Sequence, residues 1–201
     1  MRSLFNFIVK PKSGRASNKT KIGNKELILN TDLQDHRYVN RQGIVIGTPK
    51  NINTAIKKND EVIVHHNVFR RFYDVRGKET NSKSYFKEDM FFVDDSQIFL
   101  YKRNNKWFAP ENYCFIKPIK SNNIFSLDKE KPLIGIVKYL NNYLLNSGIK
   151  EGDLVGFTPR SEYEFLIEGE RLYRVTTDSI AIKYGHKGSE EEYNPSWAKS
   201  G

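Results

Sequence analysis

The feature that most constrains the fold of this chain is an internal repeat of short apolar segments. Four blocks of the first half recur in the same order in the second half. The pairs are FIVKP (7–11) with CFIKP (114–118), GIVIGTP (43–49) with GIVKYLN (135–141), IKKNDEVIVHH (56–66) with IKEGDLVGFTP (149–159), and FFVDDSQIFLYK (91–102) with YRVTTDSIAIKY (173–184). Repetition in a fixed order is typical of a duplicated structural unit, so we expect two similar domains.

The apolar runs in both halves are short, rich in Val, Ile, Phe and Tyr, and separated by Gly, Asn, Asp or Pro. This pattern is typical of strands joined by turns and predicts an all-β fold. The expected strands are Phe5–Lys10, Gly43–Ile46, Glu61–His65, Met90–Val93, Ile98–Tyr101, Tyr113–Ile116, Ile134–Tyr139, Asp153–Phe157, Glu164–Ile167, Leu172–Val175 and Ile180–Lys183. Helical structure is expected only within Ile136–Asn146 and as a turn near Asp94–Gln97.

Composition narrows the class of protein further. The single cysteine among 201 residues excludes an internal disulfide and suits a reducing cytoplasm. No apolar run approaches the roughly 20 residues of a membrane span, so we expect a cytoplasmic protein without membrane association. The net charge of +9 favours acidic partners, either nucleic acid or an acidic protein surface, without choosing between them.

The first copy carries two insertions that the second copy lacks. Lys10 and Gly43 are 33 positions apart, whereas Lys117 and Gly135 are 18 apart, so the opening stretch is about 15 residues longer in the first copy. A second insertion of about 11 residues lies near 70–85. The first one is polar and basic but contains the apolar triplet Leu27-Ile28-Leu29. Because the second copy does without this length, the insertion is expected to serve a function rather than the fold.

The order of these motifs resembles the GroES-type co-chaperonins, the lids of bacterial chaperonins. That family has an opening V-x-V-K strand, a mobile loop, a G-x-V-x-x-V/I-G strand, a V-K-x-G-D-x-V-x-F strand and a closing S-E-S-D-I-L-A-I segment. The matching segments here are Phe7–Lys10, Gly43–Gly47, Ile56–Val64 and Val93–Leu100, repeated as 135–137, 149–155 and 176–182. The resemblance implies two GroES-like small β-barrels in tandem. Their bounds would be 1–104, with a mobile loop at 13–42, and 105–187, followed by a flexible C-terminal tail at 188–201.

The resemblance also implies a function. Family members dock a hydrophobic tripeptide of the mobile loop onto the chaperonin, and Leu27, Ile28 and Leu29 match it in position and type. The chain would form a homo-oligomeric ring that caps an ATP-bound GroEL-type chaperonin and encloses a substrate protein. It would not itself be an enzyme, because ATP hydrolysis belongs to the chaperonin.

The chain departs from the family pattern in three ways. It has two copies, only the first has a long loop, and the roof hairpin is reduced to about 48–55. These departures resemble the divergent co-chaperonins of large phages, which enclose a bulky capsid protein, so a viral member would act in the host cytoplasm. Other functions remain open: a basic tandem β-barrel that binds nucleic acid, and a virion structural or assembly protein.

Basic and aromatic residues interleave in FRRFYDVRGKETNSKSYF (69–86). The residues able to face a substrate or to bind nucleic acid by charge and stacking are Arg70, Arg71, Phe72, Tyr73 and Arg76. A long hairpin with a solvated rim explains the segment better, so nucleic acid is not expected as the main partner.

The remaining candidates for chemistry are weaker. His65 and His66 are adjacent in an expected strand, where neighbouring side chains point to opposite faces, so we expect no metal site. Cys114 lies in an apolar strand and is expected to be a buried small hydrophobe. Asp94, Asp95 and Asp178 fit local turn capping. No catalytic set and no cofactor-binding motif is evident, so neither catalysis nor a cofactor is expected.

Overall fold

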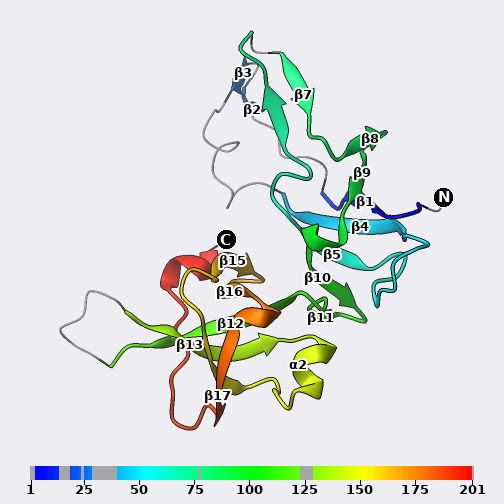
Figure 1. The fold of residues 1–201 in the computed structure, drawn as a ribbon. Coiled ribbons are helices and arrows are strands. Elements are labelled where there is room, and N and C mark those ends of the chain that lie inside the picture. Colours follow the sequence, from blue (N-terminus) through cyan, green and yellow to red (C-terminus); the bar gives the residue numbers. More distant parts are fainter. Residues whose placement is uncertain are drawn as a thin grey trace. The chain divides into compact units, whose positions relative to one another are not determined.

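The computed structural model describes residues 3–13, 19–23, 25–28, 40–76, 78–122 and 129–200, the side chains of 19–22, 25–28, 73 and 200 excepted. The described chain is mostly antiparallel β-strand with little helix, which confirms the all-β prediction (Figure 1). It divides into two compact units, Met1–Lys106 and Trp107–Gly201. The boundary predicted after residue 104 lies close to this division.

The first unit is built on a seven-stranded sheet with the spatial order β11-β10-β5-β4-β1-β9-β8. Its strands are β1 (Phe7–Pro11), β4 (Gln42–Gly47), β5 (Glu61–Val64), β8 (Tyr85–Lys87), β9 (Met90–Val93), β10 (Ile98–Arg103) and β11 (Lys106–Phe108). Two hairpins form separate two-stranded sheets: β2 (Lys19–Ile22) with β3 (Lys25–Ile28), and β6 (Arg71–Tyr73) with β7 (Glu79–Asn81). The short 3-10 helix η1 (Asp95–Gln97) joins β9 to β10.

The second unit is built on a six-stranded sheet with the order β15-β16-β12-β13-β14-β17. Its strands are β12 (Tyr113–Lys120), β13 (Glu130–Tyr139), β14 (Asp153–Phe157), β15 (Tyr163–Ile167), β16 (Glu170–Thr176) and β17 (Ile180–His186). The helical elements are α2 (Asn142–Asn146), η2 (Thr177–Ser179) and η3 (Ser196–Ser200). The helix expected within Ile136–Asn146 is confined to α2, because Asn141 accepts a hydrogen bond from the Leu144 amide and caps the helix there.

The two sheets share one topology, which confirms the internal repeat. The order β10-β5-β4-β1-β9-β8 of the first unit corresponds strand for strand to β17-β14-β13-β12-β16-β15 of the second. A 3-10 helix joins the equivalent strands in both units, η1 before β10 and η2 before β17. The sheet of the first unit adds β11 beyond β10, and the division between the units falls within this strand. Among the described residues the edge strands of neither sheet pair with each other, so neither sheet closes.

The repeat extends to the register of the strands. Pro11 pairs with Gly43 and Pro118 with Gly135 at the same point of the two sheets. The β1–β4 ladder has an irregularity between Ile8 and Val9, and the β12–β13 ladder has one at the equivalent step. A one-residue slip would move every side chain to the opposite face, so an identical register places equivalent residues in equivalent environments.

A shared turn precedes β5 and β14. Asp60 accepts a hydrogen bond from the Lys57 amide at 2.8 Å, and Asp153 accepts one from the Lys150 amide at 2.8 Å. The residue before each aspartate has a positive φ, 73° at Asn59 and 86° at Gly152. Asn and Gly are the residues that tolerate this conformation best, so the same turn forms from two different sequences.

Each unit has its own apolar core. The second unit's core contains Cys114, Ile116, Val137, Leu144, Ile149, Val155, Phe157 and Val175. The repeat relates seven of these to residues of the first unit that are also buried: Phe7, Val9, Val45, Ile56, Val62, Val64 and Val93. Apolar burial at alternating strand positions therefore stabilises both units in the same way.

The segment 188–200, expected to be a flexible tail, instead lies on the second unit. Tyr193 donates its amide proton to the Pro118 carbonyl at 2.9 Å, and Ile119 and Glu192 form an antiparallel bridge. Ala198 is fully buried. The structure differs from the expectation because backbone pairing and charge pairing, which a polar composition does not reveal, hold the segment in place.

Candidate functional site

The apolar triplet of the first insertion lies partly within an ordered hairpin. Leu27 and Ile28 belong to β3, where they pair with Thr20 and Lys19 of β2. Gly23, with a φ of 61°, lies in the turn, where glycine adopts this conformation at little cost. Leu29 lies outside the described residues. The hairpin was not predicted, because β2 is too polar to show a strand pattern.

The β2–β3 hairpin lies in a connection whose length is specific to the first unit. The chain between β1 and β4 spans 12–41, whereas the equivalent connection between β12 and β13 spans only 121–129. Both connections join strands that pair in the same register. The sheet therefore does not require the longer one, which leaves the β2–β3 hairpin available for another role.

The second insertion forms the β6–β7 hairpin, which Figure 1 shows projecting from the seven-stranded sheet. It lies in the 65–84 connection, whereas the second unit joins β14 to β15 through 158–162. The Asp74 carboxylate orders the hairpin end by accepting hydrogen bonds from the amides of Arg76 at 2.9 Å and Lys78 at 2.8 Å. The predicted hairpin with a solvated rim is thus confirmed.

Four of the five basic and aromatic candidates of this hairpin have described side chains, and their surroundings differ. The Arg70 guanidinium lies 5.3 Å from the centre of the Phe72 ring, and Phe72 is 39% exposed. Arg71 forms a salt bridge with Glu79 at 3.1 Å across the hairpin. Arg76 lies at the exposed end, and Tyr73 belongs to β6. Arg70, Phe72 and Arg76 therefore retain the features of a weak anion-binding and stacking surface.

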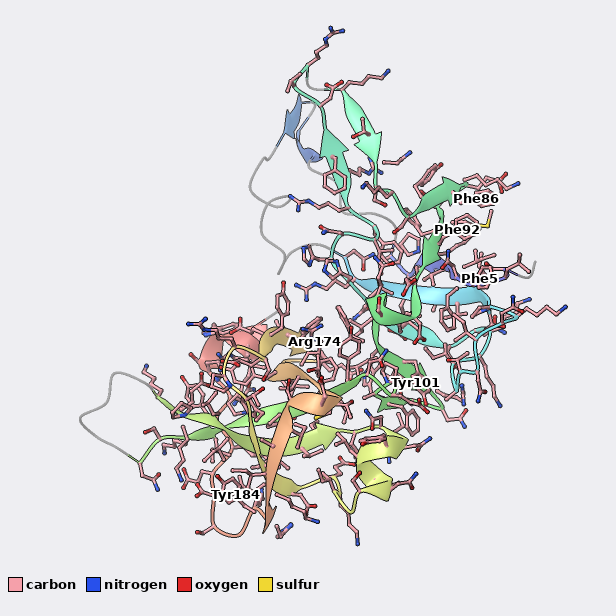
Figure 2. All side chains as sticks on the ribbon, viewed as in Figure 1. Phe5, Phe86, Phe92, Tyr101, Arg174 and Tyr184 are labelled. Carbon is pink, nitrogen blue, oxygen red and sulfur yellow. The ribbon has the colours of Figure 1, made fainter. Side chains whose placement is uncertain are left out.

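Two other aromatic residues of the same segment differ in burial. Phe69 is buried and packs edge-on against Phe91, with ring centres 5.0 Å apart. Phe86 on β8 instead lies against Phe92 on β9, with ring centres 4.8 Å apart (Figure 2). Phe86 is 41% exposed. The sequence pattern places Phe69 and Phe86 in one group of aromatic residues. The structure shows that Phe69 is buried and Phe86 is partly exposed.

Contrary to the sequence prediction, the side chains of His65 and His66 do not point to opposite faces of a strand. His65 and His66 follow the end of β5, and their rings stack with centres 4.2 Å apart instead of pointing to opposite faces. The reason is that β5 ends at Val64, so strand alternation no longer applies. Within the described ranges, no group of three His, Cys, Asp or Glu side chains could hold a metal ion.

Two predictions about single residues are confirmed. Cys114 is fully buried in the second core, and burial raises the pKa of its thiol to about 12. Asp94 caps η1 by accepting a hydrogen bond from the Ser96 amide, while the Gln97 side chain accepts one from the Asp94 amide. This reciprocal cap accounts for Asp94 without a catalytic role. Asp178 lies within η2 but is not its capping residue, which is Thr176.

Sequence reasoning missed a polar cluster on the second unit. The C-terminal glutamates pair with lysines of β12 and β13, and Lys117 also pairs with Glu170 of β16. Donation from Lys117 holds the pKa of Glu192 below its ordinary value. The one signal in the sequence for this cluster is the run of three glutamates at 190–192 in an otherwise basic chain.

A second polar cluster surrounds Arg171 of β16. Its guanidinium contacts Glu130 at 2.6 Å and Glu164 at 2.8 Å, and it donates to the Tyr173 hydroxyl at 2.7 Å. Burial raises the pKa of Tyr173, and its hydrogen bond to Glu130 adds to this effect. Each of these side chains has a hydrogen-bond partner within the cluster, which therefore links β13, β15 and β16.

The sequence matches no known protein-family model and has no significant similarity to any curated protein. In the described part of the chain, no helix is long and apolar enough to cross a membrane.

Proposed function

We propose that this chain is a divergent co-chaperonin that caps an ATP-bound GroEL-type chaperonin and assists folding of an enclosed protein. In this proposal the two units correspond to the tandem GroES-like small β-barrels of that family, with sheets that stay open among the described residues, and the chain assembles as a homo-oligomeric ring. The repeated six-strand order and the placement of the long β1–β4 connection support it. The role is that of a binding partner, with ATP hydrolysis left to the chaperonin.

The observation that carries the proposal is the apolar triplet within the insertion specific to the first unit. Leu27 and Ile28 extend along β3, and extended apolar residues can be buried in a groove of a partner. Each such side chain contributes about 1.5–3 kcal/mol when fully buried. Ordering the flanking chain costs about 1–2 kcal/mol per residue, so a single site would bind weakly. Several chains in one ring would bind through several such sites at once, so their combined affinity would be high while each contact stays reversible.

The test is replacement of Leu27, Ile28 and Leu29 by Ser in the full chain. We expect the variant to keep its β-sheet circular-dichroism spectrum and to lose capture by a GroEL-type chaperonin with ATP. Thr20→Ser in the facing strand is the matched control and should leave capture intact. Unchanged capture of the triple variant would show that the triplet is not the anchor.

A second candidate function is binding of single-stranded nucleic acid by the β6–β7 hairpin. It is favoured by the exposed Phe72 ring beside Arg70 and by Arg76 at the hairpin end. Filter binding of labelled dT20 should then weaken steeply with salt and weaken further on replacing Arg70, Arg71 and Arg76 by Gln. Absence of binding at low salt would exclude this function.

A further inference from the structure

The edge of β12 is left open by the fold itself. The β12–β16 ladder ends where Ile116 pairs with Tyr173, and the β1–β9 ladder of the first unit ends at the equivalent pair of Val9 and Phe91. Beyond this point β12 continues to Lys120, so the backbone of Pro118–Lys120 can accept another strand. Unpaired edge positions of this kind are templates for the addition of an extended segment.

In the structure this edge is occupied by the chain's own residues 190–193. Lys120 donates its amide proton to the Glu191 carbonyl at 2.8 Å, and the Tyr193 amide donates to Pro118 at 2.9 Å. The bridge between Ile119 and Glu192 lies between these two bonds and is antiparallel. The segment is therefore bound as a short additional strand.

Three consecutive glutamates of the segment meet separate lysines. Glu190 contacts Lys131 at 2.6 Å, Glu191 contacts Lys120 at 3.1 Å, and Glu192 contacts Lys117 at 2.9 Å. Lys187 adds a further contact to Glu192 at 3.3 Å. Only 15% of the Lys117 side chain is exposed. The edge thus combines backbone pairing with a row of ammonium groups, a combination that selects extended acidic peptides.

The segment is separable from the core beneath it. None of residues 190–193 belongs to the core cluster around Cys114, and the buried Ala198 lies beyond them in η3. The charge pairs of the segment differ in exposure. Glu191 is 71% exposed, so its pair with Lys120 is weak and screened by salt, whereas Glu190 and Lys131 are partly buried. Asn194 beyond it bonds the Arg171 amide and the Gly169 carbonyl. Local release without unfolding of the sheet is the expected behaviour of a terminal segment of this kind.

We propose that the β12 edge, with Lys117, Lys120 and Lys131, is a binding slot for an acidic extended peptide of a partner protein, and that residues 190–193 occupy it in cis as an internal competitor. Backbone pairing favours a peptide over a nucleic acid, since a polynucleotide has phosphates but no amide ladder. The slot stands independently of the co-chaperonin role, because it rests only on contacts within the second unit.

The test uses the full chain and a fluorescein-labelled peptide with the sequence GSEEEYNPSWAKSG, followed by fluorescence anisotropy at low salt. A chain with Glu190→Gln, Glu191→Gln and Glu192→Gln holds its own segment less tightly. We expect it to bind the peptide about tenfold more tightly than the unchanged chain, because the tethered competitor is weakened. Equal affinity of both chains, or no binding by the variant, would overturn the proposal.

Two controls locate the site and its specificity. Adding Lys120→Gln and Lys131→Gln to the triple variant should lower affinity at least tenfold, with an unchanged circular-dichroism spectrum showing that the fold is kept, since Lys120 is exposed and Lys131 half-buried. A peptide with three glutamines in place of the glutamates should bind equally poorly. Binding of dT20 to the triple variant with the affinity of the acidic peptide would show a general polyanion surface and contradict the peptide assignment.

Discussion

Gly43 and Gly135 occupy equivalent places, and neither has room for a side chain. A Cβ atom at Gly43 would lie 2.5 Å from Val9 Cγ1 and 2.9 Å from the Lys10 carbonyl oxygen. A Cβ at Gly135 would overlap Ile116 Cγ2 and lie 2.5 Å from the Lys117 carbonyl oxygen. Both glycines let β4 and β13 approach the strand beside them, so their place in the repeat reflects packing rather than a turn.

Gly135→Ala should therefore destabilise the second unit by about 1–3 kcal/mol, since the backbone of β12 cannot move away as a flexible side chain would. Urea unfolding followed by circular dichroism measures the change. The matched control is Lys138→Ala, farther along the same strand, where the side chain is partly exposed and its salt bridge to Glu170 is weak. A Gly135→Ala chain as stable as this control would show that the strands relax at no cost.

At the scale of elements, short strands with strong apolar character could be predicted from sequence. Met90–Val93 and Asp153–Phe157 were predicted with their observed bounds, because each is bounded by polar turn residues. The strands β6 and β7 carry no apolar alternation, so they are absent from the expected strands although a hairpin is expected in this segment. They form because a local turn and hairpin pairing supply their hydrogen bonds, which a hydrophobic pattern does not record.

The candidate site was predictable only in part, for the same reason. Composition located the triplet containing Leu27 and Ile28 within an insertion, but not the β2–β3 pairing around it. The pairing of the C-terminal glutamates with lysines depends on residues more than 50 positions apart, such as Lys131 and Glu190, which no local pattern connects. Contacts of this range are set by the tertiary fold.

The acidic segment should also detach from β12 in acid. Donation from Lys117 lowers the pKa of Glu192 in the folded chain, so its stabilising contribution is complete above the ordinary glutamate pKa of about 4.3 and is lost as the pH falls through the lowered value. Trp197 lies in η3, which follows Glu192 in the sequence. The NMR signal of its indole should report detachment of the segment below about pH 4. The Glu192→Gln chain should lose this part of the titration, and an identical titration in both chains would contradict the assignment.

At the scale of the whole molecule, each unit has a core of its own. The second core is formed by residues of Trp107–Gly201 alone, and Cys114 is buried within it. Because burial raises the pKa of the thiol to about 12, it remains protonated near pH 8 and reacts only when that core opens. The single cysteine of the chain is thus a reporter for one unit.

We expect the folded chain to be almost unreactive toward Ellman's reagent at pH 8 and fully reactive in guanidinium chloride. Gly135→Ala should accelerate labelling of the native protein, whereas Gly43→Ala in the first unit should not, because Cys114 belongs to the core cluster of the second unit. The absorbance at successive times measures both rates. Equal acceleration by the two substitutions would show that the units unfold together.

The common register has a consequence for the design of substitutions. Since Pro11 pairs with Gly43 as Pro118 pairs with Gly135, the register itself aligns the two halves of the sequence residue by residue. Positions with the same residue in both halves, such as these prolines and glycines, are those where the shared backbone geometry limits the choice of side chain. When a residue is exchanged for its counterpart in the other half, the new side chain is one that already occurs at the equivalent backbone position of the same chain.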